Sequence, residues 1–180
     1  MLILAGVAGA GKSMQGKLLD ESGYYWLSTG ELFRKSVTGK RKEEMLAGKL
    51  LSDDEVIELV DAYLTKIPAG RELVLDGFPR TVHQADWLLS QASSEDLRLR
   101  GVFNFVISKD VVKGRLMNRG RQDDTSEVIE KRFADYEQTT LPILDYLKQK
   151  GVQVIDIDAD QDPKQVFSDL KSCIDKLPAK

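Results

Sequence analysis

A glycine-rich segment at the start of the chain most constrains what the sequence can fold into. The apolar run at residues 2–5 leads directly into residues 6–13, which satisfy the pattern GxxxxGK[ST]. Glycines let successive backbone N–H groups turn inward around an anion, and a helix that begins there adds its positive dipole end. An incidental glycine-rich turn would not need a strand before it and a helix after it. The segment therefore predicts a phosphate-binding loop in which Lys12 contacts the phosphates.

The rest of the chain alternates short apolar runs with longer segments of helical periodicity. Several of the apolar runs are nearly continuous, as expected for strands that are covered on both faces. Ser52 and Glu55 form a capping box, and Gly23 and Gly151 stand where helix C-caps belong. This alternation predicts an α/β fold with a doubly wound, five-stranded parallel sheet flanked by helices. The expected strands are residues 2–5, 26–28, 73–76, 102–107 and 152–157, and the expected helices are residues 12–22, 30–37, 42–47, 54–66, 82–93, 111–119, 126–150 and 163–177.

Charge and cysteine content exclude several classes of partner. The 180 residues include 26 basic and 29 acidic side chains, a net charge of −3, whereas nucleic-acid-binding domains usually carry a basic excess. A small anion held by a few well-placed cations remains compatible with this balance. The single cysteine, Cys173, excludes an intrachain disulfide and a cysteine-based zinc site. An unpaired thiol fits a reducing, cytoplasmic compartment, and no stretch approaches the roughly 20 apolar residues that span a bilayer. We therefore expect a cytoplasmic protein that contacts neither nucleic acid nor a membrane, and we also expect a monomer.

One carboxylate and a set of arginines extend the phosphate-binding pattern. Asp76 ends the expected strand at residues 73–76, where it could hold Mg²⁺ directly or through water, or could cap the following turn. Guanidinium groups match the oxygens over which phosphoryl transfer spreads its charge, and Arg115 and Arg119 share one helix face. The arginines that could act in this way are Arg34, Arg80, Arg115, Arg119, Arg121 and Arg132.

Four blocks of the sequence, in order, resemble the adenylate kinase family of nucleoside monophosphate kinases. The resemblance covers nearly the whole chain, and the run from Asp76 to Arg80 is highly specific to that family. The blocks are residues 6–13, residues 27–34, residues 75–80 with Gln84, and residues 119–124 followed by Arg132.

The resemblance implies a P-loop NTPase-like fold with two small additions to one domain at residues 1–180. These would be a monophosphate-binding flap at residues 28–51 and a short lid at residues 118–124, which leaves no room for a zinc-binding extension. The core would consist of residues 1–27, 52–117 and 125–180.

The resemblance also implies roles for individual residues, with Asp76 holding Mg²⁺ through water and no zinc bound. ATP would be held by Gly9, Ala10, Gly11, Lys12, Ser13, Met14, Arg115, Arg119 and Gln161. AMP would be held by Thr29, Arg34, Lys49, Leu50, Leu51, Gly77, Phe78, Pro79, Arg80, Gln84, Arg121 and Arg132. Catalysis would rest on Lys12, Arg80, Arg119, Arg121 and Arg132.

The implied activity is reversible, Mg²⁺-dependent transfer of the terminal phosphoryl group of ATP to AMP, which yields two ADP. One alternative is a UMP or CMP kinase, although Thr29 and Gln84 favour adenine. Another is a nucleotide-binding regulator with weakened catalysis, because Ser13 and Met14 stand where the family usually has glycine and threonine. Against the regulator, every phosphate-facing cation that the family needs is present.

Overall fold

Five parallel strands form a single sheet in the order β2-β3-β1-β4-β5. The structure is a computed structural model that describes residues 1–36, 52–92, 97–119 and 125–178. The first strand lies at the centre of the sheet, and the chain adds strands on one side of it before crossing to the other, which confirms the doubly wound topology. The strands are β1 (Leu2–Gly6), β2 (Tyr25–Ser28), β3 (Leu73–Asp76), β4 (Gly101–Val106) and β5 (Val154–Asp158).

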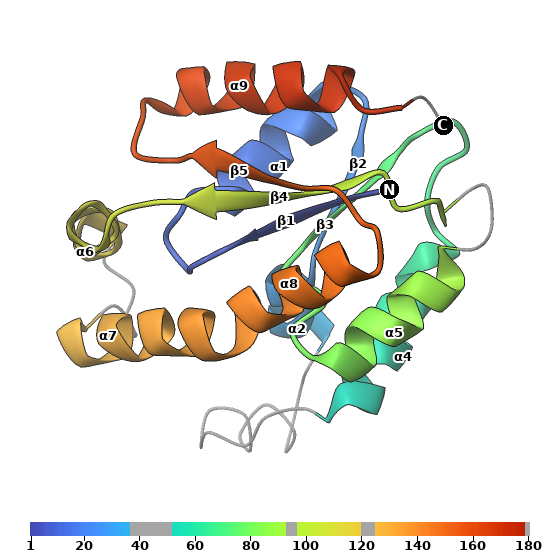
Figure 1. Ribbon diagram of the computed structural model, residues 1–180, viewed down its shortest axis with the longest axis horizontal. Helices are drawn as coiled ribbons and strands as arrows, with labels where there is room; N and C mark the ends of the chain where they lie inside the picture. Colours follow the sequence, from blue (N-terminus) through green and yellow to red (C-terminus); the bar gives the residue numbers. More distant parts are fainter. Residues whose placement is uncertain (37–51, 93–96, 120–124, 179–180) are drawn as a thin grey trace.

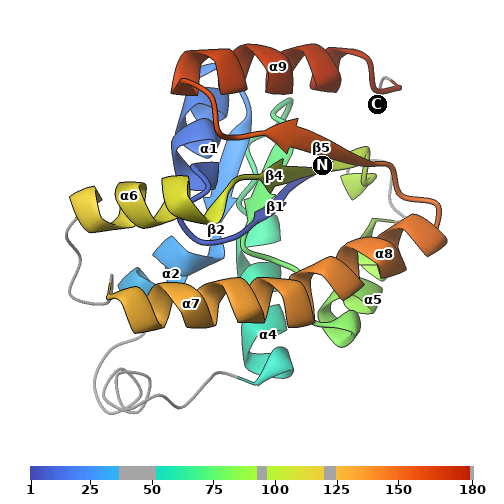
Figure 2. The same ribbon diagram turned by 60° about the vertical axis from the view of Figure 1, so that its left-hand side comes forward.

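Helices cover both faces of this sheet, as Figure 1 and the turned view in Figure 2 show. On one face lie α1 (Lys12–Glu21) and α9 (Pro163–Asp175); on the other lie α4 (Asp53–Leu64), α5 (Val82–Gln91) and α8 (Leu141–Gln149). The remaining helices lie toward the edge at which the strands end, the carboxyl edge. These are α2 (Thr29–Ser36), α6 (Lys109–Arg119) and α7 (Ser126–Asp135).

Alternating side chains of the strands divide the core into two clusters. Leu4 and Phe103 pack in the cluster that α1 and α9 cover, whereas Ile3 and Val102 pack in the cluster that α5 and α8 cover. Side chains of a strand point alternately to its two faces, so a strand buried on both faces needs an unbroken apolar run. The near-continuous apolar runs of the sequence are thus explained by two buried faces.

The predicted helix ends are confirmed where their caps could be recognised in the sequence. The N–H of Tyr24 donates to the carbonyl of Leu19 and that of Gly23 donates to Asp20, a Schellman motif in which Gly23 has a φ of 98°. The same pair of bonds ends α8 at Gly151. At the start of α4, Ser52 and Glu55 form both bonds of a capping box.

Other predicted boundaries were wrong. The helix expected at residues 126–150 is interrupted by a π-helical turn, Tyr136–Thr140, which joins α7 to α8. The fifth strand begins at Val154 rather than at Val152, because the Val152 N–H closes the end of α8 by donating to Leu147. The helix expected at residues 42–47 lies outside the described residues.

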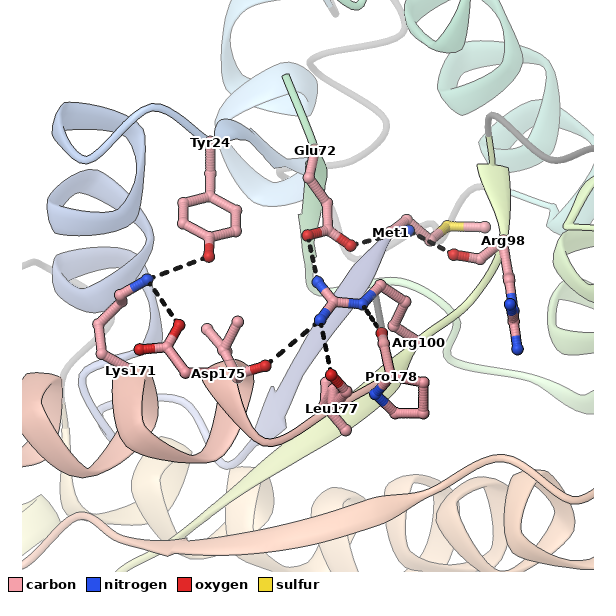
Figure 3. A network of polar contacts seen from close by, with 10 residues as sticks. Met1, Tyr24, Glu72, Arg98, Arg100, Lys171, Asp175, Leu177 and Pro178 are labelled. Carbon is pink, nitrogen blue, oxygen red and sulfur yellow. Dashed lines mark hydrogen bonds and ion pairs between the residues drawn. The ribbon is translucent and has the colours of Figure 1, made fainter. Parts of the chain in front are cut away.

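Arg100 forms a polar cluster at the edge at which the strands begin, the amino edge (Figure 3). Its guanidinium pairs with Glu72 at 2.7 Å between Nη1 and Oε2, and both side chains are only 11% exposed. The other nitrogens donate to backbone carbonyls at the end of α9, those of Ile174, Leu177 and Pro178. A cation is favoured beside the carbonyls that end a helix, so Arg100 fastens α9 to the sheet.

Along the segments that the structure describes, no helix has the length and apolar character needed to cross a membrane.

Candidate active site

The phosphate-binding loop follows β1 and opens α1 at the carboxyl edge of the sheet. Gly6, Gly9 and Gly11 have φ values of 134°, 96° and 96°, which only glycine adopts without strain. A Cβ on Gly9 would also lie 2.9 Å from Leu116, so this glycine lets α6 approach the loop. Gly11 is the N-cap of α1 and provides no side-chain hydrogen bond to it. The first amides of α1 are therefore available to an anion.

Lys12 lies folded over this loop. Its Nζ donates to the carbonyls of Gly6 and Val7 at 2.6 and 2.9 Å. Burial lowers the pKa of Lys12 below the usual 10.5, an effect that Asp76 opposes and Arg80 reinforces. An ammonium group has three protons, and these two carbonyls accept two of them. Among the described contacts, one N–H remains for a phosphate oxygen.

The carboxylate of Asp76 lies at the end of β3, and the side chain is only 4% exposed. Its Oδ2 accepts a hydrogen bond from Ser13 Oγ at 2.9 Å. The backbone beside it is fixed by Thr29, whose buried hydroxyl lies 3.2 Å from the Asp76 carbonyl oxygen and 3.0 Å from that of Gly77. The predicted metal-holding carboxylate and the predicted loop serine are therefore in direct contact.

Arg80 and Gln84 lie in the segment that follows β3. Arg80 Nε donates to the carbonyl of Gly77 at 2.8 Å, and a Cβ on Gly77 would lie 2.7 Å from Thr29 Oγ1. Gln84 is 4% exposed: its Oε1 accepts from the Arg80 N–H, and its Nε2 donates to Asp53 Oδ1, both at 2.8 Å. Each end of that amide has a second hydrogen-bonding position, so one donor and one acceptor remain beyond these bonds.

A cavity of about 650 Å³ lies at the carboxyl edge, and the phosphate-binding loop, Asp76 and Arg80 line it. One part of it is lined by the start of α9 and by Arg115, whose Nη2 donates to the Gln161 carbonyl at 3.2 Å. The sequence-predicted site residues that line the cavity are Gly9, Ala10, Gly11, Lys12, Ser13, Met14, Asp76, Gly77, Arg80, Arg115 and Gln161.

Comparisons with known proteins agree with this geometry. The model of the family described as adenylate kinase matches residues 4–152. The chain belongs to the adenylate kinase family. An adenylate kinase of Corynebacterium urealyticum is 36% identical over 97% of this chain and 99% of its own length. Those of Corynebacterium aurimucosum and Prochlorococcus marinus strain AS9601 are 41% and 39% identical over 88% and 94% of this chain, and over 90% and 96% of their own lengths.

The activity is thus that of an adenylate kinase, a nucleoside monophosphate kinase that uses ATP. An adenylate kinase implies Mg²⁺, and the oxygens at this site suit it. Mg²⁺ binds through one or two protein oxygens together with water and substrate phosphates. Asp76 and Ser13 offer a carboxylate and a hydroxyl beside the phosphate-binding loop. In the parts of the chain that the structure describes, no cluster of three or more His, Cys, Asp or Glu side chains could hold a metal.

Several residues that the family resemblance implies lie away from this cavity or outside the described residues. Thr29, Phe78 and Gln84 are buried and do not line the cavity, nor do Pro79 and the half-buried Arg132 on α7. The backbones of Arg34 and Arg119 are in α2 and α6, but their side chains are not described. Outside the described residues lie Lys49, Leu50, Leu51 and Arg121.

Sequence reasoning missed residues that act through contacts between neighbouring helices on the same face of the sheet. Asp53 holds both Gln84 and Thr81, and the buried Gln15 donates from Nε2 to the Pro163 carbonyl at 2.9 Å. The capping box at Ser52 could have indicated that Asp53 begins a helix, but not which side chains it would meet. The position of Pro163 after the fifth strand could have placed it at the carboxyl edge.

Proposed function

We propose that the phosphate-binding loop holds the phosphates of ATP and that Arg80 bridges them to the phosphate of AMP. The observation that carries this proposal is the arrangement around Asp76. This buried carboxylate lines the cavity together with Lys12 and Arg80. The other charged side chains that line it are Lys17, Arg115 and Glu31, so four basic groups face two carboxylates. Such a cavity has an excess of positive charge, which phosphate groups would neutralise.

The proposed mechanism requires no general base. The second pKa of a phosphate monoester is about 6, so the attacking oxygen of AMP is already largely ionised at neutral pH. Lys12, Arg80 and the amides at the start of α1 would align the two substrates and stabilise the charge on the phosphoryl group in transfer. Mg²⁺, when bound, neutralises part of that phosphate charge. Arg119, Arg121 and Arg132 would add further positive charge.

The base of ATP would lie between α6 and the start of α9. Arg115 and the Gln161 carbonyl are bonded to each other there, and Pro163 and Val166 provide an apolar surface. AMP would lie on the side of Arg80, where Thr29, Gly77 and Gln84 support the segment after β3. The remaining donor and acceptor of Gln84 would read the adenine edge, since adenine presents one of each on that edge.

The division of the chain into core, flap and lid also stays a proposal. The flap at residues 28–51 includes the end of β2 and all of α2, and the lid at residues 118–124 includes the end of α6. Their other residues, 37–51 and 120–124, lie outside the described residues. The proposed role of both segments is to cover the substrates and exclude water, which would otherwise compete with AMP as phosphoryl acceptor.

A panel of monophosphates tests the proposed base recognition. ADP formation from AMP, UMP and CMP, each with ATP and Mg²⁺, is measured for the parent protein and for Gln84→Leu. We expect the parent to prefer AMP over UMP and CMP. Gln84→Leu should lose that preference by about 10-fold or more, because leucine cannot form the proposed hydrogen bonds to the adenine edge. Gln149→Leu, at the exposed end of α8, is the matched control. A preference for UMP or CMP in the parent would favour a pyrimidine kinase instead.

A further inference from the structure

The bond between Ser13 and Asp76 has a feature that a purely structural contact would not need. Ser13 is the second residue of α1 and is exposed in the cavity, whereas the carboxylate that it contacts is almost fully buried. The hydroxyl donates its proton to Asp76 Oδ2 at 2.9 Å. Both lone pairs of the hydroxyl oxygen are therefore left to accept from, or to coordinate, something in the cavity.

A hydroxyl group that coordinates a cation must direct its proton elsewhere. An acceptor held on the far side fixes the orientation of the ligand, as outer partners do in metal sites generally. Asp76 provides such an acceptor at the rigid end of β3, and Ser13 is adjacent in sequence to Lys12, the residue expected to contact the phosphates. In other nucleotide-binding proteins with the GxxxxGK[ST] pattern, the hydroxyl of the final Ser or Thr binds Mg²⁺. The family pattern has glycine at this position, so the resemblance placed Ser13 against ATP but did not imply a metal ligand here.

The charges around this pair determine when a cation could bind. Four basic side chains line the cavity, Lys12, Lys17, Arg80 and Arg115, against two carboxylates, Asp76 and Glu31, so a metal ion alone would be repelled. A metal ion that arrives with triphosphate brings its own negative charge. Binding should therefore require the nucleotide.

We propose that Ser13 Oγ is a direct ligand of the divalent cation that enters with ATP, with its proton held by Asp76, which itself acts through water. The inference rests on the proposed binding of ATP phosphates by the loop, and it adds a protein ligand that the glycine of the family pattern cannot supply. Mg²⁺ prefers oxygen ligands, whereas a thiol prefers softer ions such as Cd²⁺.

Replacement of the oxygen by sulfur tests the direct bond. Because Cys173 is the single cysteine of the sequence, Cys173→Ala provides a background without thiols. In that background, Ser13→Cys is mixed with a non-hydrolysable ATP analogue and Cd²⁺. We expect a cadmium NMR resonance shifted into the thiolate range. The background protein without the new cysteine, and the Ser13→Cys protein without the analogue, should not show it.

Manganese affinity provides a second measurement that does not depend on turnover. The binding of Mn²⁺ to the complex with the analogue is followed by the electron paramagnetic resonance of the unbound ion. Ser13→Gly should weaken Mn²⁺ binding by about 10-fold or more, whereas Ser13→Thr, which keeps the hydroxyl, should stay near the parent. The affinity of Ser13→Gly for the analogue in the presence of EDTA should stay within about twofold of the parent, since the loop amides remain.

An unshifted cadmium resonance together with unchanged Mn²⁺ affinity in Ser13→Gly would overturn the inference and leave the hydroxyl a structural contact. An equal loss of analogue affinity with and without metal would also overturn it, because the serine would then act on the loop. The titration in EDTA tests the proposed phosphate site separately. If Lys12→Ala bound the metal-free analogue as tightly as the parent does, that site would be contradicted, and the ligand role of Ser13 with it.

Discussion

The two edges of the sheet each hold cationic groups, but the cations differ in their partners. At the amino edge, Arg100 pairs with Glu72 and donates to three carbonyls at the end of α9 (Figure 3). At the carboxyl edge, Lys12 and Arg80 donate to neutral carbonyl oxygens and line a cavity in which four basic side chains face two carboxylates.

This difference separates a structural cluster from a binding site. A guanidinium whose charge and donors are matched within the protein stabilises the fold and attracts nothing further. Cations that exceed the local anions favour an anion from outside. Helix α1 links the two edges, since it begins at the phosphate-binding loop and its C-cap region at Tyr24 contacts Lys171 of α9.

The largest expected effect comes from Lys12→Ala at the carboxyl edge. Turnover should fall about 10²–10³-fold, as when one preorganised donor to a transition state is removed. The free energy of unfolding without nucleotide should not fall, because the variant no longer buries an ammonium group whose charge lacks a matched partner. Initial rates of ADP formation and urea unfolding measure the two effects. Lys66→Ala, beside Tyr63 after α4 and outside the cavity, is the control and should lose far less activity.

The pH dependence of the same residue sharpens this prediction. Burial lowers the pKa of Lys12, so its charge is lost as pH rises through a value below 10.5. Affinity for an ATP analogue should therefore decline in that range for the parent but not for Lys12→Ala. Stability without nucleotide changes in the opposite direction, since between the lowered pKa and 10.5 the unfolded chain binds more protons than the folded protein. If the affinity of the parent and that of Lys12→Ala depended on pH in the same way, the proposed contact of Lys12 with the phosphates would be contradicted.

At the amino edge, Arg100→Met should lower the stability of the fold and leave turnover unchanged. The variant leaves the 11%-exposed carboxylate of Glu72 without its guanidinium, which should lower the free energy of unfolding by about 3 kcal/mol. Turnover well below the melting temperature should stay near that of the parent. The double variant with Glu72→Gln should recover part of the loss in urea unfolding. A large fall in turnover with unchanged stability would reverse the proposed distinction between the edges.

A pair of glycines tests how α1 is held between the edges. A Cβ on Gly16 would come within 2.6 Å of Trp26 Cε2, whereas one on Gly114 in α6 meets nothing within 4 Å. Gly16→Ala should therefore lower the free energy of unfolding by about 1–3 kcal/mol. Gly114→Ala should raise it by up to about 1 kcal/mol through helix propensity alone. Thermal or urea unfolding measures both variants. If Gly16→Ala also raised the free energy of unfolding, the contact with Trp26 would be one that relaxes easily.

The smallest expected effect is that of Glu55→Ala at the start of α4. Loss of one half of the capping box should cost about 1 kcal/mol in the free energy of unfolding. Because Asp53 in the same turn holds Gln84, a modest rise in the KM for AMP should accompany it, with the KM for ATP unchanged. Glu58→Ala, exposed further along the helix, is the control. If Glu55→Ala and Glu58→Ala changed the free energy of unfolding and the KM for AMP equally, the expected contribution of the capping box would be contradicted.

Local patterns predicted most of the fold, because they depend on neighbours in the sequence. The glycines at 6, 9 and 11, the capping box at Ser52 and the run before Asp76 each predict one element and its end. The site depends on contacts between distant residues. Ser13 meets Asp76 across 63 residues and Gln84 meets Asp53 across 31, and no local pattern encodes such partners. Guanidinium chemistry singled out the arginines as candidates for binding phosphate, but the role of each one came from the family resemblance.

The π-helical turn at Tyr136–Thr140 changes what the long helical segment can do. Ile129 and Leu147 are 18 residues apart, about five turns of a regular α-helix, so they would point the same way without it. One extra residue in a turn rotates everything beyond it by about 100°. Ile129 thus packs in the cluster shared by α1 and α9, and Leu147 packs in the one shared by α5 and α8. The turn therefore sets the rotation of α8 relative to α7. Deleting one residue from it would rotate the apolar side chains of α8 away from their cluster while leaving α7 in place.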